Sequence, residues 1–157
     1  MDIVLGILAL LLGPMGGACG ADADNSCGPR AIACIVEQVN GCDYEATMKR
    51  VTARLTSWER LPGDIPQIGR ATFPWGICRA VKEEGLEGRP VMGSCELSPG
   101  QEPFIALVLE EDRWHYVAVT EVRDGEVVTN DGCQTFEGFV EKWVWSDYWR
   151  WQTELSS

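Results

Sequence analysis

The stretch NSCGPRAIACIV, residues 25–36, decides how the rest of the chain is interpreted. Gly28 and Pro29 mark a helix start, because proline lacks the N–H that a first helical turn leaves unpaired and its φ is already helical. From Ala31 to residue 39 apolar residues recur at helical spacing, which predicts a helix with one buried face. Cys27 then lies near the positive end of the helix dipole, where a thiolate is favoured over a thiol. An ordinary cysteine is more often a small buried apolar residue, and a disulfide is a third role, so this stretch alone does not identify a nucleophile.

The composition is that of one acidic globular domain. The chain has 157 residues, 45% of them hydrophobic, which is enough for a single domain with a sizeable core. A net charge of −11 argues against binding nucleic acid through phosphate contacts. The seven cysteines include no C-x-x-C pair and there is one histidine, so we expect neither a metal site nor a cofactor. The odd number of cysteines leaves at least one thiol unpaired if the others form disulfides, and it does not reveal the redox compartment.

Residues 1–23 form a hydrophobic N-terminal segment. Its apolar run, residues 3–12, has the length of a signal-peptide core and is too short to span a bilayer. Small residues follow it, as a cleavage region requires, but no Lys or Arg precedes it and residue 2 is Asp. The segment is therefore an export signal, an anchor or a helix docked on the domain, and any membrane contact is expected only through it. An exported or anchored protein and a cytoplasmic one both remain compatible with the sequence.

Residues 24–157 are predicted to form one domain with helices first and an antiparallel sheet second. After the Cys27 helix, Asp43 is expected to cap a second helix that runs to about residue 57, and Pro74 to open a third that ends near Gly85. Between them, residues 58–73 form a loop long enough to be a functional surface or a lid. Short stretches rich in Val and aromatics predict strands at residues 89–92, 104–109, 114–122 and 126–129.

Residues 136–151 carry four tryptophans and are predicted to be a helix or an irregular segment that closes the chain. Such a cluster is either the packed end of a small domain or a platform for a sugar or a peptide, and packing is the commoner case. The whole pattern predicts an α+β domain of two sub-regions.

His115, the only histidine, stands at the start of the strand predicted at residues 114–122. Asp131 follows the strand at residues 126–129, and Asp124-Gly125 is a strong hairpin signal between the two strands. Folding this hairpin is expected to bring His115 beside Asp131, so that the carboxylate fixes one imidazole nitrogen and the other faces a thiol. A lone histidine beside a strand is more often structural, Asp131 is also a plausible turn residue, and Asn130 is a rival third member.

Together these stretches resemble the papain-like cysteine peptidases of the bacteriocin-leader-processing, or double-glycine peptidase, type, especially stand-alone relatives without a transporter. The resemblance rests on five stretches in the family's order, namely residues 25–31, 74–85, 103–108, 115–120 and 130–132. It implies the papain-like α+β fold, with an N-terminal helical part and an antiparallel sheet. It also implies that Cys27 is the nucleophile, His115 the general base and acid, and Asp131 the residue that orients the base.

The sequence departs from the family at the oxyanion donor. The family has a glutamine a few residues before the cysteine, whereas no Gln precedes Cys27 here. Loss of such a donor costs about 10²–10³ in rate. Asn25 offers an amide two residues before Cys27 and is the candidate substitute, although a helix-entry cap is its ordinary role.

The expected function is thiol-dependent hydrolysis of a peptide or other amide bond through a Cys-His-Asp triad and a thioester, with a peptide or protein as substrate. Acyl transfer to an amine uses the same residues. One alternative is a catalytically degenerate relative that binds a peptide or protein partner, which the missing glutamine favours. Another is hydrolysis of peptidoglycan peptides, which exposed tryptophans on an exported domain would suit.

Overall fold

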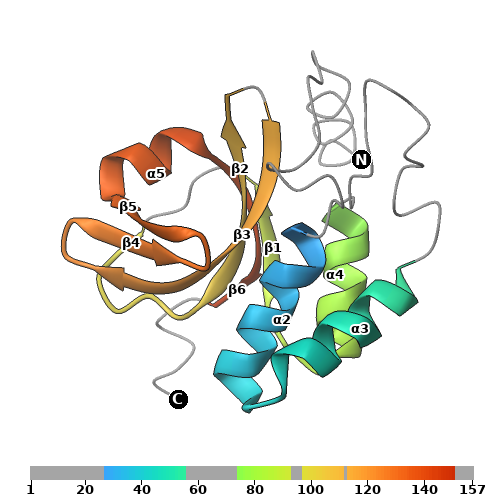
Figure 1. The fold of residues 1–157 in the computed structure, drawn as a ribbon. Coiled ribbons are helices and arrows are strands. Elements are labelled where there is room, and N and C mark those ends of the chain that lie inside the picture. Colours follow the sequence, from blue (N-terminus) through green and yellow to red (C-terminus); the bar gives the residue numbers. More distant parts are fainter. Residues whose placement is uncertain (1–26, 56–73, 93–96, 112, 151–157) are drawn as a thin grey trace.

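The computed structural model describes residues 27–55, 74–92, 97–111 and 113–150 (Figure 1). The hydrophobic segment 1–23, Asn25, the expected loop 58–73 and Trp151 lie outside these residues. The described elements follow in chain order: α2 (Cys27–Asn40), α3 (Tyr44–Arg54), α4 (Pro74–Glu83), β1 (Arg89–Met92), β2 (Phe104–Glu110), β3 (Arg113–Arg123), β4 (Glu126–Thr129), β5 (Gly132–Thr135), α5 (Phe136–Lys142) and β6 (Trp143–Trp149). No helix in this part of the chain is long and apolar enough to cross a membrane.

The strands form one six-stranded sheet in the order β1-β6-β2-β3-β4-β5, in which every neighbouring pair is antiparallel. The predicted hairpin is present, because Arg123 pairs with Glu126 across Asp124 and Gly125. The φ of Gly125 is 79°, a value that side chains rarely allow. The strands predicted at residues 89–92 and 126–129 have the observed bounds, and the other two are longer by a residue at one or both ends.

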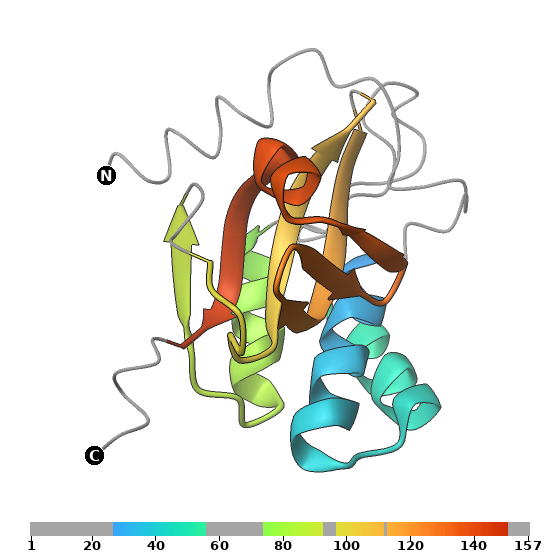
Figure 2. The same cartoon turned by 90° about the vertical axis from the view of Figure 1, so that its left-hand side faces the viewer.

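The three N-terminal helices lie together on one side of the sheet (Figures 1 and 2). α2 packs against β3, α3 packs against α2, and α4 contacts both α2 and β6. Asp43 caps α3 as predicted, since its Oδ1 accepts the backbone N–H of Ala46 at 2.8 Å. The helices and the sheet enclose a core to which Ile32, Val51 and Ile77 contribute buried side chains. Helices first and a sheet second is the predicted α+β arrangement.

The C-terminal stretch differs from the prediction. Residues 136–142 are the short helix α5, but residues 143–149 are strand β6, inserted between β1 and β2 in the interior of the sheet. Its tryptophans Trp143, Trp145 and Trp149 are between 1% and 4% exposed. The ring of Phe104 is tilted against that of Trp143 and meets that of Trp149 edge to face, and these side chains pack with α5 in a second core on the other side of the sheet. The cluster is therefore packing, and these three side chains form no exposed platform.

Candidate catalytic site

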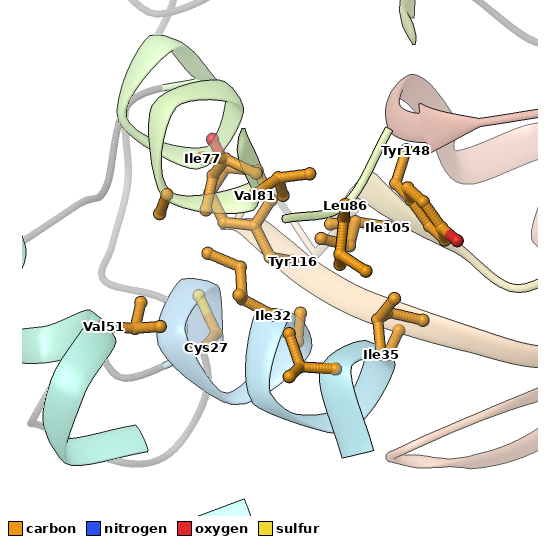
Figure 3. Close-up of a cluster of buried hydrophobic side chains, with 14 of the residues drawn as sticks. Cys27, Ile32, Ile35, Val51, Ile77, Val81, Leu86, Ile105, Tyr116 and Tyr148 are labelled. Carbon is orange, nitrogen blue, oxygen red and sulfur yellow. The ribbon is translucent and has the colours of Figure 1, made fainter. Parts of the chain in front are cut away.

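Cys27 is the first residue of α2 and lies at the edge of the core between helices and sheet. Its residue is 8% exposed, and it belongs to the same buried cluster as Val51 and Tyr116 (Figure 3). The next two residues, Gly28 and Pro29, are buried, so the first turn of α2 is fixed by packing on the domain. The sulfur sits at the positive end of a 14-residue helix. That position stabilises a thiolate when the thiol is free.

Cys27 is disulfide-bonded. Cys34, Cys42, Cys78 and Cys133 are free thiols. The thiolate is the nucleophilic form of cysteine, and a sulfur bound in a disulfide is not available as one. Any attack by Cys27 on a carbonyl therefore requires reduction first.

His115 and Asp131 meet as the hairpin predicts. His115 lies near the start of β3 and its Nε2 pairs with Oδ2 of Asp131 in the turn between β4 and β5. The His115 side chain is 17% exposed, whereas the Asp131 side chain is 52% exposed. Nδ1 of His115 is buried and has no hydrogen-bond partner among the described residues. Because the carboxylate occupies Nε2, Nδ1 is the nitrogen left to exchange a proton with another group.

The turn that carries Asp131 is fixed by its neighbours. Oγ1 of Thr129 accepts the N–H of Asp131 at 3.1 Å and donates to the carbonyl of Gly132 at 3.0 Å. Asn130 binds β3 twice: its Oδ1 accepts the N–H of Ala118 at 2.9 Å and its own N–H donates to the Ala118 carbonyl at 3.1 Å. The Asn130 side chain is thus engaged with the sheet, and the geometry favours Asp131 as the partner of His115.

The helix that begins at Cys27 and the strand that carries His115 pack directly against each other. Tyr116 belongs to the cluster that includes Cys27, and Trp114 packs against that cluster. Both chain neighbours of His115 therefore face the Cys27 helix layer, while its ring reaches the β4–β5 turn.

Asn25 lies outside the described residues, so its role as oxyanion donor stays a prediction. No group of three or more potential metal ligands occurs among the residues that the structure describes.

Two of the free thiols are held in the protonated form. Burial, followed by the charge of Glu37, raises the pKa of Cys34. Burial, followed by the neighbouring Asp147 carboxylate, raises the pKa of Cys78 to about 12. Neither thiol is therefore a competing nucleophile at neutral pH.

One buried polar group was not predicted from the sequence, and it consists of Cys78 on α4, Tyr116 on β3 and Asp147 on β6. Asp147 is 3% exposed; its Oδ1 accepts the N–H of Tyr148 at 2.6 Å, and its Oδ2 has no hydrogen-bond partner in the described part of the chain. Burial is the largest cause of a raised Asp147 pKa and also raises the pKa of Tyr116. No local signal in the sequence marks this group, because its members come together only when β6 enters the sheet.

Comparison with solved structures identifies the fold. The chain superposes on the crystal structure of the peptidase domain of Streptococcus ComA, a bifunctional ABC transporter involved in a quorum-sensing pathway, with a TM-score of 0.55 and 19% identity over 85% of this chain and 96% of that one. The chain has the fold of a papain-like peptidase domain. The peptidase domain of Streptococcus mutans ComA also matches, with a TM-score of 0.47 and 16% identity over 83% of this chain and 94% of that one. No family model and no curated protein sequence matches the chain. In this peptidase fold the predicted papain-like α+β architecture is confirmed.

Proposed function

We propose that the chain is a thiol-dependent peptidase of the double-glycine type and is related to the members of that type that stand alone, without a transporter. In this proposal Cys27 is the nucleophile, His115 is the general base and acid, and Asp131 orients His115. The observation that carries the proposal is the pairing of His115 Nε2 with Asp131 in a domain with a peptidase fold. This pairing leaves the buried Nδ1 as the proton-transfer atom. The place of Cys27 at the positive end of a helix that packs on the histidine strand supports it further.

The reaction follows from these roles. In the reduced protein, Nδ1 of His115 takes the thiol proton of Cys27, and the sulfur attacks the peptide carbonyl to form a tetrahedral oxyanion. The imidazolium, held by Asp131, then gives its proton to the leaving amine, and a thioester remains on Cys27. Water, activated by the same imidazole, attacks the thioester and releases the acid.

Two groups are proposed for the oxyanion. The backbone N–H of Cys27, in the first turn of α2, is the first of them. The side-chain amide of Asn25 is the proposed second donor, in place of the glutamine that the resembled family uses. If Asn25 has this role, Asn25→Ala lowers kcat by about 10²–10³ with little change in KM.

A non-catalytic binding domain is the second candidate. The disulfide at Cys27 and the missing glutamine favour it. For the peptidoglycan alternative, which depends on exposed tryptophans, Trp143, Trp145 and Trp149 are buried and Trp75 is 36% exposed, so it stays a prediction.

The discriminating experiment uses the fully reduced protein, with a mixture of unstructured peptides as substrate and cleavage products identified by mass spectrometry. Cys27→Ala and His115→Ala are expected to lower the cleavage rate by about 10⁴-fold, because members of a catalytic triad act as a unit. Cys133→Ala is the matched control, since Cys133 is an exposed free thiol on the edge strand β5. An electrophilic thiol probe at mildly acidic pH is expected to label Cys27 first. Cleavage that persists in both triad variants, or uniformly slow labelling, contradicts the proposal.

A further inference from the structure

The turn between β4 and β5 carries Asp131 beyond the strand pairing that anchors this hairpin. β4 ends at Thr129, which is opposite Val119 of β3 on one side and opposite Gly132 of β5 on the other. Only Asn130 and Asp131 join the two strands. In the sheet that the structure describes, β5 is the edge strand and pairs with β4 alone (Figure 1). Asp131 is therefore outside the strand pairing, and other contacts must hold its backbone.

The side chain of Thr129 makes these contacts. Its hydroxyl accepts the backbone N–H of Asp131 at 3.1 Å and donates to the carbonyl of Gly132 at 3.0 Å. Thr129 is 7% exposed, so little water reaches the hydroxyl to compete for the two bonds. Among the described residues, no other group bonds the N–H of Asp131. One buried hydroxyl thus fixes the backbone on both sides of the Asp131 carbonyl.

The Asp131 carboxylate, in contrast, is weakly restrained. Its side chain is 52% exposed, and its only hydrogen bond within the described part of the chain is the one to Nε2 of His115. A half-exposed carboxylate with a single contact readily exchanges that contact for water. Its place beside the imidazole therefore depends on where the backbone of the turn puts it.

We propose that Thr129 is a positioning residue: its hydroxyl fixes the backbone at Asp131 so that the carboxylate stays on Nε2 of His115. The inference rests on the proposed function, because it gives Thr129 a role in the same site. A carboxylate held at Nε2 keeps the proton of the neutral ring on that nitrogen, so that the buried Nδ1 is free to take a proton. When the carboxylate is displaced, the ring also adopts the tautomer with its proton on Nδ1, which cannot act as the base.

The opposing interpretation is a hydroxyl that only stabilises the hairpin, and Thr135 provides the matched comparison. Thr135 lies at the other end of β5, and its hydroxyl also accepts a backbone N–H, that of Gly138, at 3.2 Å. Thr129→Val and Thr135→Val each remove one such hydroxyl and keep the β-branched shape. If both hydroxyls act on stability alone, both variants lower the urea midpoint and neither changes the histidine. If Thr129 is a positioning residue, Thr129→Val alone changes the histidine.

The first measurement is the tautomer of His115, which is the only histidine of the chain and therefore gives unambiguous proton–nitrogen correlation signals. The whole chain is measured at the high-pH end of a titration, where the imidazole is neutral. The wild type, Thr129→Ser and Thr135→Val are expected to show a protonated Nε2 and an unprotonated Nδ1. Thr129→Val is expected to show the averaged nitrogen shifts of a ring that exchanges between tautomers, as is Asp131→Ala, the reference for loss of the pair.

The second measurement is the kinetics of the fully reduced protein on a peptide that the wild type cleaves. Thr129→Val is expected to lower kcat by about 10–100-fold, the loss that is typical when a group orienting a functional side chain is removed. KM should change little, because Thr129 does not touch the substrate. Thr129→Ser is expected to restore the wild-type kcat, and Thr135→Val to keep it. Circular dichroism checks the fold, and Thr129→Ala is the second variant without the hydroxyl.

Three outcomes overturn the role of Thr129 and leave the proposed function intact. They are a wild-type tautomer and kcat in folded Thr129→Val, an equal effect of Thr135→Val, and unfolding of both Thr129→Val and Thr129→Ala, which assigns the hydroxyl to stability. The failure of the proposed function gives a different result. If the tautomer responds as expected but the wild type cleaves no peptide, the peptidase assignment is wrong, and with it the role of Thr129 in a reaction.

Discussion

Asn130 and Asp131 are adjacent in the turn between β4 and β5, and their side chains make contacts of different kinds. Asn130 accepts the N–H of Ala118, a fully buried residue of β3, whereas Asp131 reaches the imidazole of His115 and is half exposed. The contact of Asn130 stabilises the sheet, whereas the contact of Asp131 orients the base of the proposed reaction.

Substitution of the two residues is expected to separate stability from activity. Asn130→Ala leaves the buried N–H of Ala118 unpaired, which costs about 1–3 kcal/mol of unfolding free energy in urea titrations. Asp131→Ala is expected to change stability by less than about 0.5 kcal/mol and to lower kcat/KM of the reduced protein by about 10²–10⁴-fold, since the base loses its orientation. Asn130→Asp keeps the acceptor oxygen and is the conservative control. The assignment is wrong if the effects are reversed, with Asn130→Ala losing the chemistry and Asp131→Ala only the stability.

At the scale of single elements, the sequence did not predict strands β5 and β6, and β6 is the one that lies inside the sheet. The predicted strands have local signals, as in the hairpin at Asp124 and Gly125. β6 is buried on both faces and its pairing is irregular at two places, between Leu107 and Val108 on one side and between Arg89 and Val91 on the other. Trp143 and Trp145 are two residues apart yet belong to different cores. Such irregularities interrupt the regular alternation of side chains between the two faces, and this alternation is the pattern by which a strand is recognised in a sequence.

Near the second irregularity, between β1 and β6, the residue that precedes β1 is a glycine, Gly88. Tyr148 has a φ of 57°, which is uncommon for a residue with a side chain. A Cβ on Gly88, the residue before β1, would lie 2.4 Å from the Cα of Tyr148 and 2.7 Å from its carbonyl carbon. Only glycine therefore allows β1 to approach β6 at this point.

Gly88→Ala is expected to force β1 and β6 apart and to lower the unfolding free energy by about 1–3 kcal/mol or more, as overpacking does. The measurement is urea unfolding followed by tryptophan fluorescence, which reports the buried indoles of β6. Glu87→Ala, at the exposed neighbouring position, is the control and is expected to stay within about 0.5 kcal/mol of the wild type. Equal stability of Gly88→Ala and the wild type would show that the two strands can separate at no cost.

At the scale of the whole molecule, contacts that depend on short-range sequence patterns were predicted correctly. Contacts between segments that are distant in the sequence were not predicted. The His115–Asp131 pair was predictable because one hairpin brings the two residues together. The Asp147–Cys78–Tyr116 group was not, because it joins β6, α4 and β3, whose approach only the complete fold determines. The peptidase architecture was reached through a family resemblance and not through periodicity.

Two buried carboxylates, Glu84 and Asp147, change the stability of the fold in opposite directions as the pH changes. Glu84 on the helical side accepts hydrogen bonds from Arg50 at 2.7 and 2.8 Å and from Arg54 at 3.0 Å, and its side chain is 5% exposed. The hydrogen bonds from Arg50 are the largest cause of its lowered pKa. A lowered pKa means that its contribution to stability is present above the unfolded-state pKa and is lost as the pH falls through the folded-state value.

Asp147 acts in the other direction. Burial is the largest cause of its raised pKa, and the N–H of Tyr148 only partly opposes it. A raised pKa means that stability is fully present below the unfolded-state pKa and is lost as the pH rises through the folded-state value. Ionisation of the buried Asp147 carboxyl therefore lowers the stability of the fold.

Urea unfolding of the wild type, Glu84→Gln and Asp147→Asn across pH 3–8 is expected to separate the two effects. Glu84→Gln loses charge-assisted hydrogen bonds, so at pH 7 it is expected to be less stable than the wild type by about 1.5–3 kcal/mol. The deficit should shrink below about pH 4, where Glu84 of the unfolded chain is protonated. Asp147→Asn should be more stable than the wild type at pH 7, and its advantage should disappear at low pH, because the wild-type carboxyl is then neutral in both states. Glu83→Gln, on the exposed side of α4, is the control for a lost surface charge. Parallel pH profiles for all four proteins would mean that neither carboxylate is coupled to folding.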